Sequence, residues 1–397
     1  MIKLFYLGID IGKKTHHASL MDNTGKLLFK GYSFSNTTAG GELLLEHLDR
    51  HVNDYSQVCV GMEATGHYWL TIYSFLYDKE LLIHVINPIQ TDGWRKGVEI
   101  RKRKTDTIDS ALIADLIRYG AFVENPIADE TLFSLRNLTR FRTYLVDSIS
   151  DLKRKIICVL DQVFPEYETV FSNIFGATSK QILLDYTTPS ELEQLSVDKL
   201  AKILSKASRK KIHPTKAEEL SNIANNSFGV TFAKEAFTFQ IRQLIQQMQF
   251  VEKQVKDTET EIQKLMDKLG SVITTIPGIG PTTGAIILSE IGDINRFNSP
   301  VKLVAFAGLD ASVTKSGQFE GTYNVMSKRG SPYLRRAIYQ AALVAYNKDP
   351  VLSAFYHKKR SEGKHHKTCL GAVSRKLCYI IYAVLKANKP YEVRPPN

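Results

Sequence analysis

The chain has 397 residues, enough for two or three domains, with a globular composition of 43% hydrophobic and 23% charged residues and a net charge of +11. No apolar run approaches the roughly 18 residues that a membrane-spanning helix needs, and the N-terminus lacks the layout of a signal peptide. The four cysteines are scattered without a CxxC pair, which predicts reduced thiols in a cytoplasmic protein and argues against a zinc site.

Positive charge is concentrated at the C-terminal end. Residues 328–397 contain 15 Lys and Arg against 3 Asp and Glu, whereas the remainder has 37 against 38. A basic region on a near-neutral body is typical of nucleic-acid binding, although a solvated, solubilising surface would have the same composition. A second basic cluster leads into an acidic motif, as expected if a polyanion must reach the acids, although a mobile exposed loop could look the same. It consists of Arg95, Lys96, Arg101, Lys102, Arg103 and Lys104.

Residues 1–128 are predicted to be α/β. KLFYLGID, HHASLMD and KLLFKGYSF have the pattern of strands, and the turn signal DNTGK separates the second from the third. A helix is expected from Thr38 to His51. QVCVGME and LLIHVINP are further predicted strands, with HYWLTIYSFLYDK between them as a helix. Two hairpin-linked strands followed by a β-α-β unit match the RNase H/RuvC-like layout.

Four acidic residues occur where a two-metal nuclease places its ligands. Asp10 interrupts the apolar run LFYLGIDIG, and Glu63 ends the run VCVGMEATG. A carboxylate at the end of a buried strand is costly unless a cation neutralises it, and Mg²⁺ takes oxygen ligands. Asp106 and Asp109 in KTDTID begin a helical stretch and share one face of it. With Thr105 they could instead only cap that helix; with Asp10 and Glu63 we interpret them as ligands of Mg²⁺ or Mn²⁺.

The middle region, residues 129–269, is predicted to be helical. Apolar residues recur in alternating steps of three and four from Leu135 to Val163 and from Phe237 to Leu269, each run with one polar exception. Sustained heptads favour a coiled coil, either as an antiparallel hairpin or between protomers, which would set spacing and oligomeric state. Prolines divide the insertion 166–232 into short pieces, and its basic run SKASRKKIHPTK is weak evidence for a nucleic-acid contact.

Residues 270–397 form the predicted C-terminal domain. IPGIGPTTGAIILSEIGDI has the pattern of a helix-hairpin-helix motif, whose glycines would expose backbone N–H groups to a phosphate; a tight turn between packed helices would look the same. A helix is expected to begin at Ser331 and Pro332, and AVSRKLCYIIYAVLKA reads as a final amphipathic helix. Contacts to nucleic acid are expected from Gly278, Gly280, Lys328, Arg329, Arg335 and Arg336.

The motifs at the two ends of the chain occur together in one known family. The front carries GIDIGKKTH, EATGHYW, VINP and KTDTIDSALIA, and the back carries IPGIGPTTGAIILSEIGD, FAGL, an SG pair, MSKRGSPYLRRA and LGAVSRKLCYIIYAVLK. In this order they resemble the DEDD-type insertion-sequence transposases related to the Piv DNA invertases, which are bridge-RNA-guided recombinases. The insertion 166–232 is longer than in compact members, so the resemblance does not extend to the tip of the coiled coil.

The resemblance implies a composite active site. Asp10, Glu63, Asp106 and Asp109 would hold Mg²⁺, and Ser316 of the SG pair would attack a DNA phosphate to form a phosphoserine link. It also implies an RNA that pairs with donor and target DNA, and a tetramer built from dimers in which acids and serine come from different protomers. Considered without the family, Ser316 is a turn residue. Packing or phosphate contacts, rather than catalysis, are expected of His16, His17, His67, His365 and His366.

The sequence therefore predicts a DNA transposase or recombinase that acts in the cytoplasm, associated with the nucleoid. One alternative is a metal-dependent nuclease or junction resolvase that hydrolyses DNA with water, for which the acids alone suffice. Another is a non-catalytic nucleic-acid scaffold. The expected architecture is α/β plus all-α, with a RuvC/RNase H-like domain at 1–128, a coiled-coil helical region at 129–269 and a helical transposase domain at 270–397.

Overall fold

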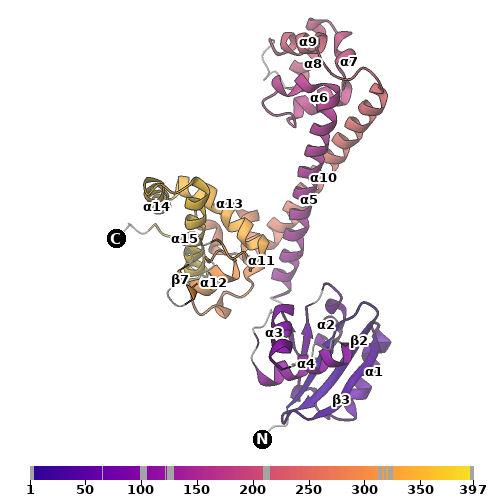
Figure 1. The fold of residues 1–397 in the computed structure, drawn as a ribbon, viewed down its shortest axis with the longest axis vertical. Helices are drawn as coiled ribbons and strands as arrows, with labels where there is room; N and C mark the ends of the chain where they lie inside the picture. The colour runs from indigo at the N-terminus through magenta and orange to yellow at the C-terminus, as the bar shows by residue number, and fades with distance from the viewer. Residues whose placement is uncertain are drawn as a thin grey trace. The chain divides into compact units, whose positions relative to one another are not determined.

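The computed structural model describes two compact units, Met1–Ala128 and Asp129–Asn397, and each is considered by itself (Figure 1). The first is built around a mixed sheet and the second is almost wholly helical in its described part, which confirms the predicted change from α/β to all-α. At residues 98, 315, 316, 319 and 320 the structure describes the backbone but not the side chain. The described residues are 4–64, 66–98, 105–120, 122, 129–208, 215–311, 315–316, 319–320 and 325–393.

The sheet of the first unit has five strands in the order β3-β2-β1-β4-β5. The first three strands are antiparallel neighbours, whereas β4 runs parallel to both β1 and β5. This order confirms the predicted hairpin-linked strands followed by a β-α-β unit. The strands are β1 (Phe5–Asp10), β2 (Thr15–Asp22), β3 (Leu27–Ser35), β4 (Val58–Glu63) and β5 (Leu82–Ile86).

Helices cover both faces of this sheet. Because successive side chains point to opposite faces, Leu7 and Ile9 of β1 are buried with α1 and α2, whereas Gly8 and Gly61 lie against α4 on the other face. Asp10 and Glu63 are in step with these glycines and therefore point to the α4 face. The helices of this unit are α1 (Thr38–Asp49), α2 (Trp69–Tyr77), α3 (Pro88–Val98) and α4 (Asp106–Tyr119), with a 3₁₀ turn η1 (Tyr55–Gln57) before β4.

The close approach of α4 to β1 depends on Gly8. A Cβ atom at this position would lie 2.1 Å from the backbone oxygen of Ser110 and 2.3 Å from the backbone nitrogen of Ala114. Gly8→Ala should therefore push α4 off the sheet and lower the free energy of unfolding by about 3 kcal/mol or more. Unfolding of this unit can be followed by fluorescence, since both tryptophans, Trp69 and Trp94, belong to it.

The matched control for this substitution is Gly93→Ala in the exposed part of α3. No atom lies within 4 Å of the position that the new Cβ would take, and alanine favours a helix over glycine by up to about 1 kcal/mol. This variant should melt at or above the temperature of the unaltered protein. Equal melting temperatures for Gly8→Ala and the unaltered protein would contradict the close packing of α4.

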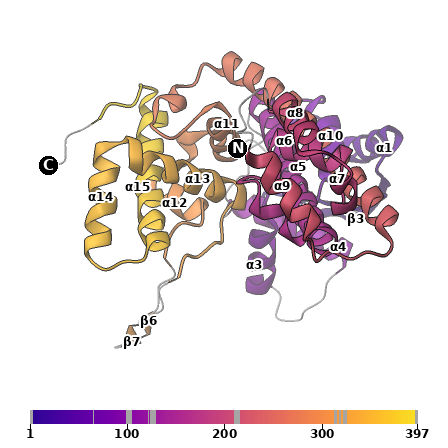
Figure 2. The same cartoon turned by 90° about the horizontal axis from the view of Figure 1, so that it is seen from above.

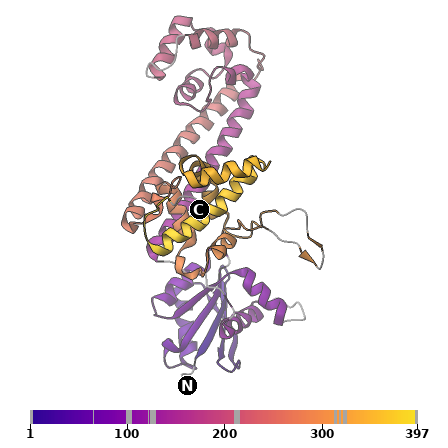
Figure 3. The same cartoon turned by 90° about the vertical axis from the view of Figure 1, so that its left-hand side faces the viewer.

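Two long helices dominate the second unit. α5 (Glu130–Val163) and α10 (Lys234–Leu269) contain 34 and 36 residues and pack against each other in opposite directions (Figure 3). The two apolar runs found in the sequence lie within them. Buried side chains along α10 recur at the spacing of one helix face, and they are Ile241, Ile245, Met248, Val251, Thr258, Ile262 and Met266.

The insertion between these helices folds into short helices whose core is shared with the adjoining ends of α5 and α10. Pro165 and Pro189 occupy the first turns of η2 and α7, where proline is tolerated, so they begin elements rather than only interrupt them. Tyr167 is fully buried, and its hydroxyl donates a hydrogen bond to the backbone oxygen of Ser179 (3.1 Å). The elements are η2 (Pro165–Thr169), α6 (Ala177–Asp185), α7 (Pro189–Glu193), α8 (Val197–Ala207) and α9 (Thr215–Asn225).

The C-terminal part of the second unit is a helical bundle that packs against the N-terminal end of α5 and the C-terminal end of α10. α11 contacts α5 and α13, and α13, α14 and α15 pack on one another (Figure 2). As predicted, Ser331 caps α13, and its hydroxyl accepts a hydrogen bond from the N–H of Leu334 (3.2 Å). The elements are η3 (Val272–Thr275), α11 (Pro281–Ile291), η4 (Ile294–Arg296), α12 (Pro300–Phe306), β6 (Lys315–Ser316), β7 (Phe319–Glu320), α13 (Pro332–Lys348), α14 (Pro350–Ser361) and α15 (His366–Ala387).

The final helix, α15, is long and apolar enough to cross a bilayer by length and mean hydropathy, a property that the search for apolar runs in the sequence did not detect. Its buried side chains, including Leu370, Val373, Leu377 and Ile381, belong to the same core as those of α11 and α13. A buried helix of a globular core passes the same length and hydropathy test, so α15 is a core helix in this fold.

Candidate metal centre

The four predicted acids converge at one edge of the sheet. β1 and β4 run parallel with Ile9 beside Met62, so Asp10 and Glu63 both stand at the carboxyl ends of neighbouring strands. α4 crosses the same face and begins at Asp106, with Asp109 one turn further on. The sheet register and the phase of one helix therefore bring together carboxylates that lie up to 99 positions apart in the chain.

A buried hydroxyl pair fixes α4 on the sheet beneath these acids. Oγ of Ser19 on β2 lies 2.8 Å from Oγ of Ser110 on α4, and it also accepts a hydrogen bond from the N–H of Gly31 (3.0 Å). Both serines are fully buried. Because an unsatisfied buried hydroxyl is costly, this pair favours one position of α4 over neighbouring ones, and so holds Asp106 and Asp109 facing Asp10.

Burial and the other three acids all act on Asp10. Burial, followed by the charges of Asp109, Asp106 and Glu63, raises the pKa of Asp10 from 3.8 to about 6, whereas His17 acts in the opposite direction. Like charges that share a partly buried site disfavour the ionised form, and a bound cation removes that penalty. Burial and the neighbouring negative charges therefore both oppose ionisation of Asp10, and a bound cation would offset both effects.

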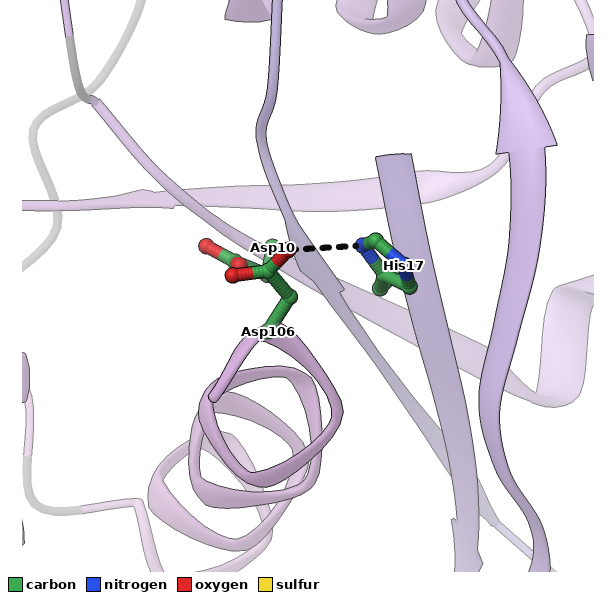
Figure 4. A group of neighbouring side chains, drawn as sticks. All are labelled: Asp10, His17 and Asp106. Carbon is green, nitrogen blue, oxygen red and sulfur yellow. Dashed lines mark ion pairs between the residues drawn. The ribbon is translucent and has the colours of Figure 1, made fainter. Parts of the chain in front are cut away.

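One corner of the cluster includes a histidine. The ligand atoms of Asp10, His17 and Asp106 all lie within 4.8 Å of one another, and Nδ1 of His17 is 3.5 Å from Oδ2 of Asp106 (Figure 4). From the sequence we expected His17 only to pack or to contact phosphate, and we did not predict its place beside Asp10 and Asp106. His17 pairs with Asp10 across the β1–β2 hairpin, so its place follows from the strand register. Its neighbour His16 points to the opposite face and is fully buried.

The opposite side of the cluster is lined by α3. The hydroxyl of Thr91 donates a hydrogen bond to Oε2 of Glu63 (2.9 Å), and the guanidinium of Arg95 donates one to Oδ1 of Asp109 (3.0 Å). The side chain of Asp109 is 7% exposed, whereas that of Asp106 is 69% exposed. Sequence reasoning missed Thr91, and it noted Arg95 only as one member of a basic cluster.

The N-terminus of α4 is also capped, as the alternative interpretation of Thr105, Asp106 and Asp109 predicted. Oγ1 of Thr105 accepts a hydrogen bond from the N–H of Ile108 (3.4 Å), and Asp106 and Asp109 both lie in the first turn of α4. Capping explains why a helix begins at this point. It does not explain the burial of Asp109 or its proximity to Asp10, because a carboxylate that only stabilises a helix N-terminus gains nothing from leaving water.

The donor set fits a divalent cation. Carboxylate oxygens are the ligands that Mg²⁺ and Mn²⁺ prefer, and an imidazole nitrogen extends the range toward transition metals. Asp10, Asp106 and His17 would hold such an ion on the solvent-exposed side. Glu63 and Asp109 lie outside this group of ligand atoms, and their charges act on Asp10 from the α3 side. When bound, a pair of cations stabilises the attacking and leaving oxygens of a phosphoryl displacement.

The two glycines predicted to bind phosphate differ in their surroundings. Gly278 adopts a positive φ of 89°, and a Cβ there would lie 2.6 Å from the backbone oxygen of Ala341, so this glycine serves a tight turn packed on α13. Gly280 is exposed at the N-cap of α11, with no atom within 4 Å of the position of a Cβ. Of the two, Gly280 leaves room for a ligand at the helix N-terminus.

The loop before α13 is held by an ion pair whose carboxylate, that of Glu290, is buried and whose arginine, Arg140, is 46% exposed. Arg140 of α5 binds both carboxylate oxygens of Glu290 (2.7 and 3.1 Å), and Ser331 donates a hydrogen bond to the same carboxylate (2.8 Å). Lys328 and Arg329, immediately before Ser331, are exposed. The network joins α5, α11 and the N-terminus of α13, and it fixes the loop that presents these two cations.

The two arginines of α13 have partners within the fold. Arg335 donates hydrogen bonds to the backbone oxygens of Ala307 and Gly330 (3.3 and 3.4 Å), which gives it a structural role. Arg336 pairs with Asp147 of α5 at 2.9 Å in an exposed position, and a phosphate could compete with that carboxylate.

Two of the predicted groups lie wholly or partly outside the described residues. Ser316 is described by its backbone alone, which pairs with Phe319 in the two-stranded sheet of β6 and β7. The basic residues beyond α3 that lie outside the described residues are Arg101, Lys102, Arg103 and Lys104.

Two family models match separate parts of the chain. Residues 7–165 match a DEDD-type transposase domain of IS110, and residues 270–357 match the transposase IS116/IS110/IS902 family, so the two matches together span more than half of the chain. A solved structure of RuvC from T. thermophilus in complex with a Holliday junction substrate is 13% identical, with a TM-score of 0.22, covering 30% of this chain and 99% of that chain.

Three relatives in the curated proteins are similar over nearly their full lengths. The insertion element IS116 44.8 kDa protein of Streptomyces clavuligerus is 25% identical over 98% of this chain and 97% of its own. A pilin gene-inverting protein of Moraxella bovis is 26% identical over 98% of each chain, and a mini-circle putative transposase for IS117 of Streptomyces coelicolor is 24% identical over 91% and 89%. The chain therefore belongs to the IS110/IS116 family of transposases, which makes it a DNA transposase or recombinase.

Proposed function

We propose that this chain breaks and rejoins DNA as the transposase of an insertion sequence, with divalent cations held by Asp10, Glu63, Asp106 and Asp109 and with Ser316 as the nucleophile. The observation that carries the proposal is the convergence of the four acids at one edge of the sheet, where burial and the charges of the other three acids raise the pKa of Asp10. His17 is the additional ligand that the geometry supports.

In the proposed reaction, Oγ of Ser316 attacks the phosphorus of a DNA phosphodiester. The hydroxyl proton is lost, a phosphoserine bond forms, and the departing strand ends in a hydroxyl group. A serine hydroxyl is a weak nucleophile at neutral pH and needs activation, which cations at the acid cluster would supply. Because one phosphodiester bond is replaced by another, the reverse attack by a new strand end rejoins DNA without ATP.

The rest of the chain would position DNA and a guide RNA. Exposed cations at Lys328, Arg329 and Arg336 and the open N-terminus of α11 at Gly280 support a phosphate-binding surface, with α11 and the turn before it as a helix-hairpin-helix motif. The basic stretch 101–104 of the first unit would supply further contacts to phosphate. Sequence choice would come from an RNA that pairs with donor and target DNA, in the nucleoid of the cytoplasm.

We further propose a tetramer built from dimers, in which acids and serine of one site come from different protomers. The long helices α5 and α10 would form a coiled coil that sets the spacing of these parts. Exposed aromatic side chains on them supply apolar surface for contact with another protomer, among them Phe141, Tyr144 and Phe250 (45%, 66% and 62% exposed).

The experiment that tests this function is recombination between donor and target DNA by the purified chain with the RNA encoded beside its gene. Strand exchange should stop when EDTA removes the cations and resume when Mn²⁺ or Mg²⁺ is added in excess. It should also stop when the RNA is omitted or digested. Exchange that continues without any divalent cation would refute the metal proposal, and exchange that continues without RNA would refute guidance.

A further inference from the structure

The inference concerns α3, which contributes two neighbours to the acid cluster. Thr91 and Arg95 are four residues apart, so they share one face of the helix. That face contacts two of the four acids, because Thr91 binds Glu63 and Arg95 binds Asp109. α3 and α4 are packed against each other in the first unit (Figure 1). The α3 side of the cluster therefore already contains a positive charge supplied by the protein itself.

The two sides of the cluster differ in their access to a cation. Asp106, on the side with Asp10 and His17, is largely exposed, and an ion can reach it from water. Asp109 is 7% exposed and Arg95 is 19% exposed, so their ion pair is mostly shielded from solvent. A divalent ion next to Asp109 would lie within a few ångströms of the guanidinium, and like charges at that separation repel strongly in a partly buried site.

We propose that Arg95 is a built-in cation that occupies the Asp109 side and must move before a second divalent ion can bind there. This inference rests on the proposed metal-binding role of the four acids. Arg95 has somewhere to move, because its guanidinium also lies 3.7 Å from the carboxylate of Asp92, which is 52% exposed. Rotation toward Asp92 would release Asp109 without leaving the guanidinium unpaired.

Such an arrangement has a direct consequence for loading of the site. The first ion binds at Asp10, Asp106 and His17, and the second binds more weakly because it must displace Arg95. A protein without nucleic acid would then hold one ion and be unable to clamp both oxygens of a phosphodiester. A phosphate group offers Arg95 another partner, since guanidinium groups bind phosphate in a bidentate manner.

The test is a titration of the metal-stripped, full-length protein with MnCl₂, with free Mn²⁺ measured by electron paramagnetic resonance. The unaltered protein should show two classes of site, one tight and one weak. In Arg95→Gln the weak class should tighten by at least about tenfold, within the range of about 10- to 100-fold by which groups behind a metal ligand change its affinity. Superimposable isotherms for the two proteins would overturn the proposal.

Arg118→Gln is the matched control. Arg118 belongs to α4, its guanidinium pairs with Asp115 (2.7 Å), and its side chain is 27% exposed. The substitution removes one guanidinium from the same unit without changing a partner of the four acids or of Asp92, so its isotherm should match that of the unaltered protein. Equal tightening in both variants would show a general charge effect and would contradict a specific role for Arg95.

Two outcomes separate this inference from the metal proposal beneath it. Asp10→Asn should lose the tight class of site in the otherwise unaltered protein, whatever Arg95 does. If Asp10→Asn binds fewer ions but the unaltered protein binds two ions with equal affinity, the cluster binds metal and the role of Arg95 is wrong. This comparison uses no Arg95 variant, so it still tests the role of Arg95 even when Arg95→Gln does not fold. If Mn²⁺ binds nowhere, both proposals fail.

Discussion

Asn in place of Asp10 should lower DNA strand cleavage by more than about 100-fold, because changes even to groups behind a metal ligand cost about 10- to 100-fold in metal affinity or activity. Asp10 lies next to His17 and Asp106, and the charges of Asp109 and Glu63 also act on it. An amide there keeps the shape of the side chain but removes its charge. The rate of cleavage in Mg²⁺ measures the effect, and DNA binding by gel shift should be unchanged.

This loss should not come from unfolding. The pKa of Asp10 is raised to about 6, above its value of 3.8 in an unfolded chain. The ionised carboxylate therefore destabilises the metal-free protein above about pH 6, and this penalty fades as the pH falls toward about 4. In EDTA at pH 7.5, Asp10→Asn should melt at or above the temperature of the unaltered protein, and the difference should shrink at lower pH.

Asp115→Asn is the matched control for the loss of one negative charge. Asp115 lies on α4, like two of the four acids, but it pairs with Arg118 (2.7 Å) and accepts a hydrogen bond from the indole of Trp94 (3.3 Å). Cleavage should remain close to that of the unaltered protein. Comparable losses in the Asp115 and Asp10 variants would mean that net charge, and not a metal ligand, explains the effect.

The convergence of the acids could be predicted because it depends on local patterns and one rule of topology. Apolar runs that end in Asp10 and Glu63 indicate two strands, and neighbouring parallel strands end at the same edge of a sheet. The spacing of Asp106 and Asp109 places both on one face of a helix whatever its surroundings. The structure brings these four residues together without any correction to the strand order.

The neighbours of the acids could not be predicted in the same way. His16 and His17 are adjacent and chemically identical, and only the register of the β1–β2 hairpin decides that His17 faces Asp10. Arg95 reaches Asp109 because of where α3 packs against α4, which is a long-range contact that no local period encodes. Local sequence patterns therefore predict the acids at the strand ends, but they do not predict the contacts that α3 makes with those acids.

The helices of the insertion between α5 and α10 could not be predicted from the sequence, for a different reason. Its helices contain only 5 to 11 residues, so any apolar period in them is short. The period in α8, at Val197, Leu200, Ile203 and Leu204, was missed. The core of the insertion joins residues from several short elements, and these include Tyr167, Ile182, Leu192, Leu200 and Leu220. Gly278 shows the same limit, because a turn packed on α13 and a phosphate-binding turn share one sequence pattern.

Alanine in place of Ser316 should eliminate every covalent link between protein and DNA and lower strand exchange by about 10⁴-fold or more, the scale of loss when a nucleophile is deleted. Without the hydroxyl oxygen no phosphoserine bond can form, although the acid cluster stays intact in the first unit. Denaturing gels of labelled DNA, with and without protease, measure the linked species. Thr314→Ala, which removes a hydroxyl two positions earlier in the chain, should keep the link.

The same experiment decides between strand transfer and hydrolysis. A nuclease that uses water needs only the acids, all of which belong to the first unit, whereas Ser316 belongs to the second. Under hydrolysis Ser316→Ala would cut DNA at the rate of the unaltered protein and leave free 5′-phosphate ends. Protein-linked ends that require Ser316 would instead exclude water as the nucleophile.

Mixing the two inactive variants shows whether one protomer supplies both halves of the site. In a mixed oligomer, an Asp10→Asn protomer still offers its serine and a Ser316→Ala protomer still offers its acids. If each site draws its acids and its serine from different protomers, random mixing should restore roughly a quarter of the sites, as expected for a repeated interface in a symmetric oligomer. If each protomer works alone, no combination of the two can be active, and the composite site is wrong even where Ser316 is the nucleophile.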